Sequence, residues 1–444
     1  MNTRAKVFHA ILITLASALL GATVGRAALV RYGWQEGSAT VDLTSATGAP
    51  DIYAGARKRT NTALAIGAEG EIAVAWAGEG ATGVVVARRN PTTGAWRRTT
   101  LASGSEVWYP DVAYAGSELR VAWMQGTFDA QPAPHGAVRE QGVDDPAAIT
   151  LADGLYGYKG PHLATDPDGV QHLTFALSEQ AKTWSQGNLY YARRVPGGSW
   201  TAPTAIITGS NVLGIWFPDL AVDGSGRVHL VWEQRISSIE EGNQFQVWYV
   251  SGTWSTSRGR LELNQSTLQR ISPETQRAGR PAIAVDEQGN VHITWTEITG
   301  NENSPGDEYV HYRRLDMSGH ATLTEAPVLV NVERPAWTTS VLAVHGAYVC
   351  AAWDSFPAAV GAGVGKEEIN LRCSRDGGDH WDEALTVLSE TDDLSIFPEV
   401  AFDSERQVHV VWEENQDGYM PWYRTGDVPR LRIFLPLVLL HSGG

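Results

Sequence analysis

Apolar and polar positions alternate along most of the chain in a unit that recurs, and each copy has the pattern of two short strands. In the copy from Phe217 to Glu233, a proline opens an apolar strand, an Asp-x-x-Gly turn follows, and a second apolar strand ends on a tryptophan and an acid. Alternation bounded by turn residues predicts a β-hairpin. Further copies run from 62 to 76, 110 to 123, 161 to 175, 281 to 297, 340 to 353 and 398 to 413, so the pattern predicts seven hairpins.

An aromatic residue closes the second strand of every copy, and successive aromatics stand 47 to 63 residues apart. These residues are Trp76, Trp123, Phe175, Trp232, Trp295, Trp353 and Trp412. A third strand and a fourth strand introduced by a tryptophan follow, as in 189–194 and 200–207. Repeats of this length are typical of propeller blades. We therefore predict an all-β fold, a seven-bladed β-propeller of four-stranded antiparallel blades, with the polar stretch 125–148 as a surface loop.

The two ends of the repeat array predict how the ring closes. Trp34 followed by Ala39 to Leu43 has the character of a fourth strand with no blade before it, whereas the last unit stops after Trp422 to Arg424 without a fourth strand. Joining them removes open sheet edges. We expect the N-terminal strand to complete the last blade, within a single propeller domain spanning residues 28–427.

The segments outside the repeats predict export. Residues 1–27 combine Arg4 and Lys6, an apolar run and a small-x-small end at Gly25 to Ala27, which predicts a secretory signal peptide, with a membrane anchor as the alternative. The tail at 428–444 is apolar but too short to span a bilayer, so we expect it to pack on the blades or to act as a docking tail. The chain is thus expected to be secreted or extracytoplasmic, or attached to the cell surface.

Charge and cysteine content narrow the partners. The whole chain has a formal net charge of −16, and residues 1–27 contribute three basic residues and no acids, so residues 28–444 carry −19. Nucleic acid and anionic membranes are therefore not expected as partners. We expect a monomer without cofactor, and no Cys/His spacing predicts a metal site. Cys350 and Cys373 fall on the second and third strands of the sixth unit, where a disulfide and two buried free thiols both fit.

One segment of the sixth unit carries a family resemblance. Ser374 to Trp381 fits the Asp-box pattern S-x-D-x-G-x-x-W. With the repeated hairpins, the chain resembles the sialidase-like, or BNR-repeat, β-propeller superfamily. We interpret Ser374, Asp376, Gly378 and Trp381 as structural, because the aspartate can accept backbone N–H bonds, the glycine can adopt an unusual turn conformation and the tryptophan can pack between sheets.

The resemblance implies glycosidase activity, but the chain departs from the family's catalytic pattern. Sialidases of this superfamily have six blades, an Arg-Ile-Pro segment in the first blade and an arginine triad that clamps the sialate carboxylate. Here seven units are present and the first carries Arg59-Thr60-Asn61. Arg59 stands where the first clamping arginine belongs, with one extra residue before the alanine.

Repeated polar residues are interpreted as scaffold. Four histidines and four aspartates each hold one repeat position, at His172, His229, His292 and His409 and at Asp166, Asp223, Asp286 and Asp403. A position repeated in this way predicts a structural role, with calcium at Asp166 to Gly169 as the alternative.

The candidate ligand site is the face where loops enter the innermost strands and leave the second strands. Aromatic platforms beside arginines and carboxylates are the groups that sugar rings require. The candidates are Arg59, Trp108, Tyr109, Trp216, Phe217, Glu233, Arg235, Arg280, Glu297, Trp337, Asp354 and Glu413. Inter-blade packing of Trp108, Trp216 and Phe397, with acids that only solvate strand ends, is the alternative.

Two classes of function fit these residues. The first is a non-catalytic protein that recognises a carbohydrate, such as a cell-surface glycan, or another partner. The second is a carbohydrate-active enzyme, either an exo-sialidase-like glycoside hydrolase or a polysaccharide lyase. The pattern assigns no catalytic residue. We expect the ligand mouth on units four, five and seven.

Overall fold

The computed structural model describes eighteen stretches of the chain. They are residues 35–36, 41–43, 62–77, 83–102, 106–127, 135–157, 160–179, 187–208, 214–236, 244–274, 277–301, 304–323, 326–332, 339–355, 367–383, 385–389, 394–415 and 419–428. The chain divides into two compact units, Met1–Gly33 and Trp34–Gly444, and every described residue belongs to the second. The predicted signal peptide and all of the predicted tail except Val428 therefore lie outside the described residues.

The strands form seven antiparallel sheets, six of them built from four consecutive strands. Blades 1 to 3 contain β3 (Ala63–Ile66), β4 (Ile72–Ala77), β5 (Gly83–Arg89), β6 (Trp96–Ala102), β7 (Glu106–Ala115), β8 (Glu118–Thr127), β9 (His135–Gly142), β10 (Ile149–Tyr156), β11 (His162–Thr165), β12 (Gln171–Leu177), β13 (Asn188–Arg194) and β14 (Thr204–Ile207). Blades 4 to 6 contain β15 (Ile215–Val222), β16 (Val228–Arg235), β17 (Phe245–Ser255), β18 (Arg260–Arg270), β19 (Arg277–Val285), β20 (Val291–Asn301), β21 (Ser304–Leu315), β22 (Val328–Val332), β23 (Ser340–His345), β24 (Tyr348–Ser355), β25 (Glu368–Ser374) and β26 (Thr386–Val387).

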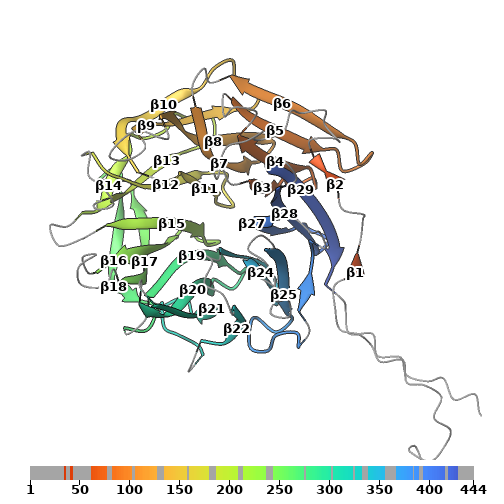
Figure 1. Cartoon of the computed structure of the whole chain (residues 1–444). Coiled ribbons are helices and arrows are strands. Elements are labelled where there is room, and N and C mark those ends of the chain that lie inside the picture. The colour runs from red at the N-terminus through yellow and green to blue at the C-terminus, as the bar shows by residue number, and fades with distance from the viewer. Residues whose placement is uncertain are drawn as a thin grey trace, which may run out of the picture. The chain divides into compact units, whose positions relative to one another are not determined.

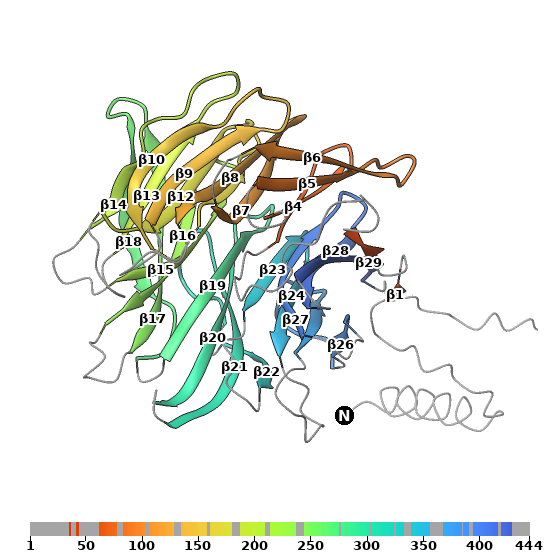
Figure 2. The same cartoon turned by 45° about the horizontal axis from the view of Figure 1, so that its top comes forward.

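The seventh sheet joins the two ends of the array. It contains β27 (Leu394–Phe402), β28 (Gln407–Asn415) and β29 (Tyr419–Asp427), with β1 (Gln35–Glu36) and β2 (Val41–Asp42) on the outer edge of β29. Gln35 pairs with Asp427, and Val41 pairs with Tyr423. Strand β29 lies beside β28 in the same sheet (Figure 2). The prediction that the N-terminal strand completes the last blade is confirmed.

The blades stand around a central axis, with the first strand of each innermost (Figure 1). Consecutive first strands contact each other around the whole ring, including β27 with β3. The predicted seven-bladed propeller is therefore confirmed. No helix among the described residues is long and apolar enough to cross a membrane.

Seven hydrophobic clusters hold the ring together, one at each junction between neighbouring blades. The aromatic residues that close the second strands are 0–1% exposed. Each packs against the preceding blade, as Trp232 does against Leu189 and Tyr191. Full burial of a side chain of phenylalanine size contributes about 1.5–3 kcal/mol. Since each aromatic faces the preceding blade and side chains alternate along a strand, the residue after each aromatic faces the following blade.

Four blades carry a buried Asp-His-Tyr link between the first hairpin turn and the third strand. In blade 4, Nδ1 of His229 lies 2.8 Å from the Tyr249 hydroxyl, and Nε2 lies 3.3 Å from Asp223 Oδ2. The carboxylate can only accept, so Nε2 donates to it and Nδ1 accepts from the tyrosine. Equivalent contacts join Asp166, His172 and Tyr191, Asp286, His292 and Tyr312, and Asp403, His409 and Tyr423. These buried contacts join the first turn, the second strand and the third strand of one blade, so their role is structural.

One prediction about the second blade is wrong. The stretch 125–148, expected as a surface loop, contains the end of β8 and the whole of β9. The strand was hidden because its buried positions are polar: Glu140 is 0% exposed and Glu140 Oε2 accepts a 2.7 Å bond from Nη2 of Arg120. A buried ion pair of this kind satisfies groups that a hydrophobic pattern counts as exposed.

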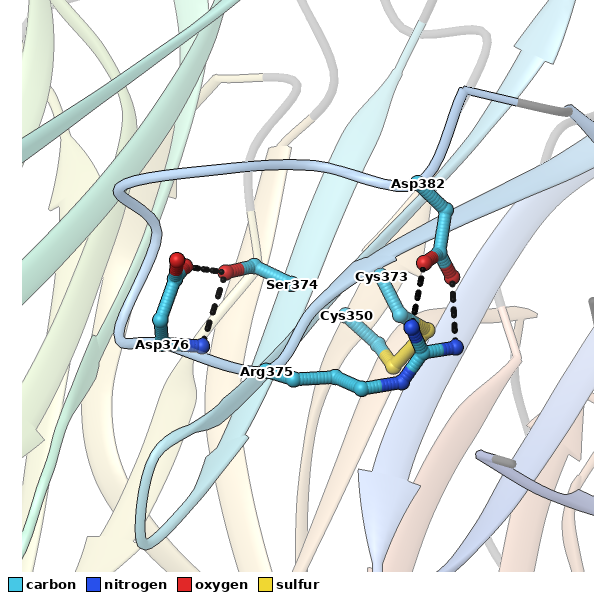
Figure 3. The surroundings of a disulfide bond; sticks show 6 residues. All are labelled: Cys350, Cys373, Ser374, Arg375, Asp376 and Asp382. Atoms are coloured by element: carbon cyan, nitrogen blue, oxygen red, sulfur yellow. Dashed lines mark hydrogen bonds and ion pairs between the residues drawn. A yellow bond between two sulfur atoms is a disulfide. The ribbon is translucent and has the colours of Figure 1, made fainter. Parts of the chain in front are cut away.

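Cys350 and Cys373, for which the sequence leaves two states open, form a disulfide. They are directly opposite each other on β24 and β25, with Cα atoms 4.1 Å apart. The turn that follows is drawn beside the bond in Figure 3. Every cysteine is thus paired, and the bond crosses the middle of blade 6.

The Asp-box segment makes the contacts of a structural turn. Asp376 Oδ1 accepts bonds from the Ser374 hydroxyl at 2.9 Å and from the His380 amide at 2.8 Å. Gly378 has φ +93°, and a Cβ there would collide with the ring of Tyr312 in blade 5. Trp381 meets the same tyrosine edge to face, with ring centres 4.9 Å apart. The segment therefore docks blade 6 on blade 5.

Candidate ligand-binding site

Four innermost strands share a backbone irregularity near the end of the ring where the chain enters them, called the mouth below. Register shifts interrupt β7, β15, β19 and β27 at this point. The residue before the proline has positive φ in each: Tyr109 (52°), Phe217 (44°), Arg280 (51°) and Phe397 (53°). This conformation costs a residue other than glycine about 1–3 kcal/mol, and bulges redirect side chains. Three aromatic residues and one arginine are therefore held in a strained but repeated conformation at the mouth.

A pocket opens between blades 4 and 5 at this end, with about 320 Å³ of empty space including the part open to solvent. Its charged and aromatic lining comprises Glu233, Phe245, Arg277, Arg280 and Glu308. These residues come from the end of β16, the start of β17, the first half of β19 and the first half of β21, and Thr296 and Ile298 of β20 complete the lining. The topology thus brings opposite charges and an aromatic ring into one concave site.

Aromatic rings support both arginines of the pocket. The guanidinium carbon of Arg277 lies 5.9 Å from the ring centre of Phe245, and that of Arg280 lies 5.2 Å from the ring centre of Phe217. Trp216 meets Phe245 edge to face at 6.1 Å. A cation over an aromatic face at these distances is attracted by the ring quadrupole, by about 0.5–2 kcal/mol. The rings therefore help to set the direction in which each guanidinium points.

Two predicted acids of the mouth are bonded to backbone rather than turned outward. Glu233 is 5% exposed, and Glu233 Oε2 accepts a 3.1 Å bond from the Arg280 amide. Asp354 is 3% exposed and accepts bonds from the amides of Thr339 (2.6 Å) and Phe397 (3.1 Å). Both acids directly follow the buried tryptophan of their blade, so both face the next blade.

A second group of acids lies deeper along the innermost strands. Asp111, Asp219 and Glu399 each follow the opening proline and keep part of their surface accessible. Burial raises the pKa of Asp111 to about 6 and that of Asp219 to about 7. Burial and repulsion from these two carboxylates raise the pKa of Glu399 well above its ordinary value. Sequence reasoning missed this group, although Pro-Asp and Pro-Glu recur at one repeat position.

Asp111 and Asp219 also link blades. Asp111 Oδ2 accepts a 2.6 Å bond from the Leu163 amide of blade 3. Asp219 Oδ2 accepts a 2.9 Å bond from the Ile283 amide of blade 5. Among the residues that the structure describes, no group of three His, Cys, Asp or Glu side chains has metal-binding geometry.

The remaining candidates are placed as follows. Trp108 is 1% exposed and packs in the cluster between blades 2 and 3, which is the packing role that the sequence left open. Glu297 is 2% exposed, and Glu297 Oε2 accepts a 3.3 Å bond from the indole N–H of Trp295, on the opposite face of its strand from the Glu233 position. Arg235 and Glu413 are 6% and 0% exposed. Arg59 and Trp337 lie outside the described residues.

The structure therefore brings together part of the predicted set. Trp216, Phe217, Glu233 and Arg280 meet at the corner of blades 4 and 5, and Tyr109 lies against Gly160 between blades 2 and 3. The candidate list omitted Phe245 and Glu308, which stand at the start of third strands or just inside them. Third strands begin at the end of the ring where second strands finish, so the repeat already placed the positions of Phe245 and Glu308 near the mouth.

Comparisons with known proteins show the fold. No family model and no curated protein sequence matches the chain. Among solved structures, an ulvan lyase of polysaccharide lyase family PL25, bound to -[GlcA(1-4)Rha3S]-, is similar with a TM-score of 0.56 and 13% identity over 82% of this chain and 92% of that chain.

Two further structures have the same architecture. The polysaccharide lyase Uly1 has a TM-score of 0.54 and 10% identity over 86% of this chain and 92% of its own. A protein of unknown function from Dyadobacter fermentans has a TM-score of 0.50 and 11% identity over 88% of this chain and 99% of its own. At these identities the likeness establishes a propeller fold that carbohydrate-active proteins share. The sialidase-like resemblance stays a prediction.

Proposed function

We propose that this chain is an exported carbohydrate-binding propeller that takes an acidic oligosaccharide in the pocket between blades 4 and 5. The observation that carries the proposal is the convergence of Arg277 and Arg280, each over an aromatic ring, in one concave site. A guanidinium pairs with a carboxylate or sulfate through two parallel hydrogen bonds, and an aromatic face packs against the C–H face of a sugar ring. The ulvan lyase bound to a glucuronate-containing ligand supports this class of ligand.

The overall charge does not oppose this ligand at the site itself. The chain carries a net charge of −16, which repels anions at a distance. Arginines in a low-dielectric pocket act over a few ångströms, whereas the field of distant surface acids is screened by salt. Binding is therefore expected to be local, and to strengthen as added salt screens the surrounding acids until the arginine contacts themselves are screened.

A second candidate is a carbohydrate-active enzyme, either a polysaccharide lyase or a sialidase-like hydrolase. The observation that favours it is the raised pKa of Asp219, about 7, two residues from Phe217 on the same strand. A carboxyl group that titrates near neutral pH is suited to proton transfer. In this reading Arg280 would neutralise the sugar carboxylate while an acid or base moves the proton.

The test is calorimetry with a panel of sialyllactose, trigalacturonate, a glucuronate-rhamnose sulfate oligosaccharide and neutral arabinotriose. The acidic sugars are expected to bind, and Arg280→Ala is expected to weaken binding ten- to a hundredfold, about 1.5–3 kcal/mol for a charge-assisted bond. Arg227→Ala is the matched control, because this arginine lies at the other end of blade 4 and donates to the Met317 carbonyl. Equal affinity for acidic and neutral sugars, or none for any, would contradict the proposal.

Turnover separates the two candidates. Each sugar is incubated with the protein, and chain cleavage is followed by mass spectrometry of the products. An unsaturated uronate end would identify a lyase, and free sialic acid would identify a sialidase-like hydrolase. Binding of an acidic sugar without either product supports the recognition function.

A further inference from the structure

We propose that Glu233 and Asp354 are positioning residues, which hold Arg280 and Phe397 in one hydrogen-bonded belt across blades 4 to 7 so that the mouth contacts its ligand as a unit. The inference rests on the proposed function for the ligand class only. The belt is built entirely from described hydrogen bonds, and each link crosses from one blade to the next or joins two strands of one blade.

The first link joins blade 4 to blade 5. Because Trp232 packs against blade 3, Glu233 faces blade 5, and Glu233 Oε2 accepts the Arg280 amide at 3.1 Å. The close approach requires a glycine at 279, since a Cβ there would collide with the carboxylate. Arg280 has φ +51° and precedes a proline, a conformation that needs support from its surroundings. Glu233 supplies that support from outside the blade.

The second link joins blade 5 to blade 6 through the arginine side chain. Arg280 Nη1 donates to the Thr339 hydroxyl at 3.1 Å. The Thr339 amide donates in turn to Asp354 Oδ1 at 2.6 Å. The backbone of Arg280 is thus held by one acid, and its side chain is held by a threonine that a second acid fixes.

The third link joins blade 6 to blade 7 and repeats the first. Asp354 directly follows Trp353, as Glu233 follows Trp232, and Asp354 Oδ2 accepts the Phe397 amide at 3.1 Å. Phe397 has φ +53° before a proline, like Arg280. One device therefore occurs twice: a buried acid from one blade holds the strained residue of the next.

The burial of the two acids decides their role. With exposures of 5% and 3%, neither presents more than a small surface to a ligand, whereas Arg280 is half-buried at the pocket. Burial raises the pKa of Asp354, while the two amides and the charge of Arg280 oppose that shift. Each oxygen of Asp354 accepts a hydrogen bond from one backbone amide, Thr339 or Phe397. Protonation of one oxygen would therefore weaken one of these two bonds. The acids thus act through Arg280 and Phe397.

The belt is tested first without ligand, by amide hydrogen exchange read at single residues on the full chain. Glu233→Ala is expected to speed exchange at Arg280, and Asp354→Ala at Thr339 and Phe397. Glu233→Gln keeps an acceptor for the one amide and should restore slow exchange at Arg280. Asp354→Asn keeps only one of two carboxylate acceptors, so it should restore one amide and not the other.

The matched control is Asp316→Ala, an acid that also accepts backbone amides, those of Ser318 and His320, but in a turn at the other end of blade 5. It is expected to speed exchange only in that turn. Unchanged exchange at Arg280, Thr339 and Phe397 in the alanine variants, or an equal rise throughout the ring, would overturn the belt.

The ligand measurement uses trigalacturonate and the same variants. Glu233→Ala and Asp354→Ala are each expected to weaken binding about tenfold, the loss of roughly one interaction, and Glu233→Gln to recover it. Wild-type affinity in the alanine variants, with exchange altered, would overturn the positioning role. If the unmodified protein binds no acidic sugar, the proposed function fails while the exchange pattern still decides the belt.

Discussion

At the scale of single residues, one step along a strand decides what an acid of this protein does. Glu233, directly after its tryptophan, faces the next blade and holds the Arg280 amide. Glu297, two residues after its tryptophan, faces the preceding blade and accepts from the indole N–H of Trp295. Side chains alternate along a strand, so this single step exchanges the blade that each acid contacts.

The deep carboxyl group of Glu399 makes a stability prediction. Its pKa is raised well above the ordinary value, by burial first and then by Asp111 and Asp219. A raised carboxyl pKa stabilises the fold below the unfolded pKa, and this contribution is lost as pH rises through the folded pKa. Glu399→Gln should therefore raise the melting temperature at pH 8 and leave it nearly unchanged at pH 4. Thermal unfolding at the two pH values measures this.

The two neighbouring carboxyl groups lose stability over a pH range of their own, and an exposed acid serves as control. The pKa values of Asp111 and Asp219, about 6 and about 7 against an ordinary value of 3.8, place the stability that these two groups lose between about pH 4 and 7. Glu405→Gln, on an exposed turn of blade 7, should change the melting temperature little at either pH. An equal gain at pH 4 and pH 8 for Glu399→Gln would contradict the electrostatic cause.

The limits of sequence reasoning also show at this scale. Phe217, Arg280 and Glu233 were predicted at the mouth because the repeat places their positions there. The direction of each side chain was not predictable, because it depends on a bulge and on positive φ at residues that are not glycine. These conformations are set by contacts with the next blade rather than by local preference.

At the scale of elements, the hairpins were predictable and the third strands less so. Each second strand carries a mostly apolar run that leads to a buried aromatic, as from Val228 to Trp232 and from Val408 to Trp412, so its pattern is unambiguous. Strand β9 escaped prediction because the Arg120–Glu140 ion pair fills its buried side. The disulfide was undecidable because it depends on the register that sets Cys350 opposite Cys373.

This disulfide makes the prediction at the element scale. It joins β24 to β25 across a sequence separation of 23 residues. Closing a loop of this length in the unfolded chain corresponds to about 3 kcal/mol of stability. Cys350→Ala combined with Cys373→Ala should therefore lower the urea midpoint. A reductant should lower the midpoint of the natural chain and leave that of the double variant unchanged, and identical midpoints for the oxidised and reduced natural chain would refute the contribution.

At the scale of the whole molecule, stability depends on the last junction as much as on any other. The cluster between blades 7 and 1 contains Leu43, Trp76 and Tyr423, so it needs residues from both ends of the described chain. Without β1 and β2, the edge of β29 would present unpaired N–H and C=O groups to other chains. Ring closure therefore protects the molecule from association as well as stabilising it.

Deleting residues 28–44 tests closure directly. The truncated chain lacks β1 and β2, so we expect oligomers or aggregates in size-exclusion chromatography and a lower melting temperature. Deleting only residues 28–34 keeps both strands and should leave the elution volume unchanged. A monomeric product of the longer deletion with the melting temperature of the whole chain would show that closure is dispensable.

The pairing of Val41 with Tyr423 also sets an order in time. A ribosome delivers blades 1 to 6 as contiguous segments, each of which holds all four strands of its own sheet and can pair as it emerges. Strands β1 and β2 must wait, unpartnered, until residues 419–427 of β29 have been made. These pairings with β29 have the longest separation in sequence among the described strand pairs, so their loop-closure entropy is the largest and they form last. A chaperone that shields a single unpaired strand during synthesis would therefore act on β1 and β2. The strands of blades 1 to 6 would not need it, because each can pair within its own blade.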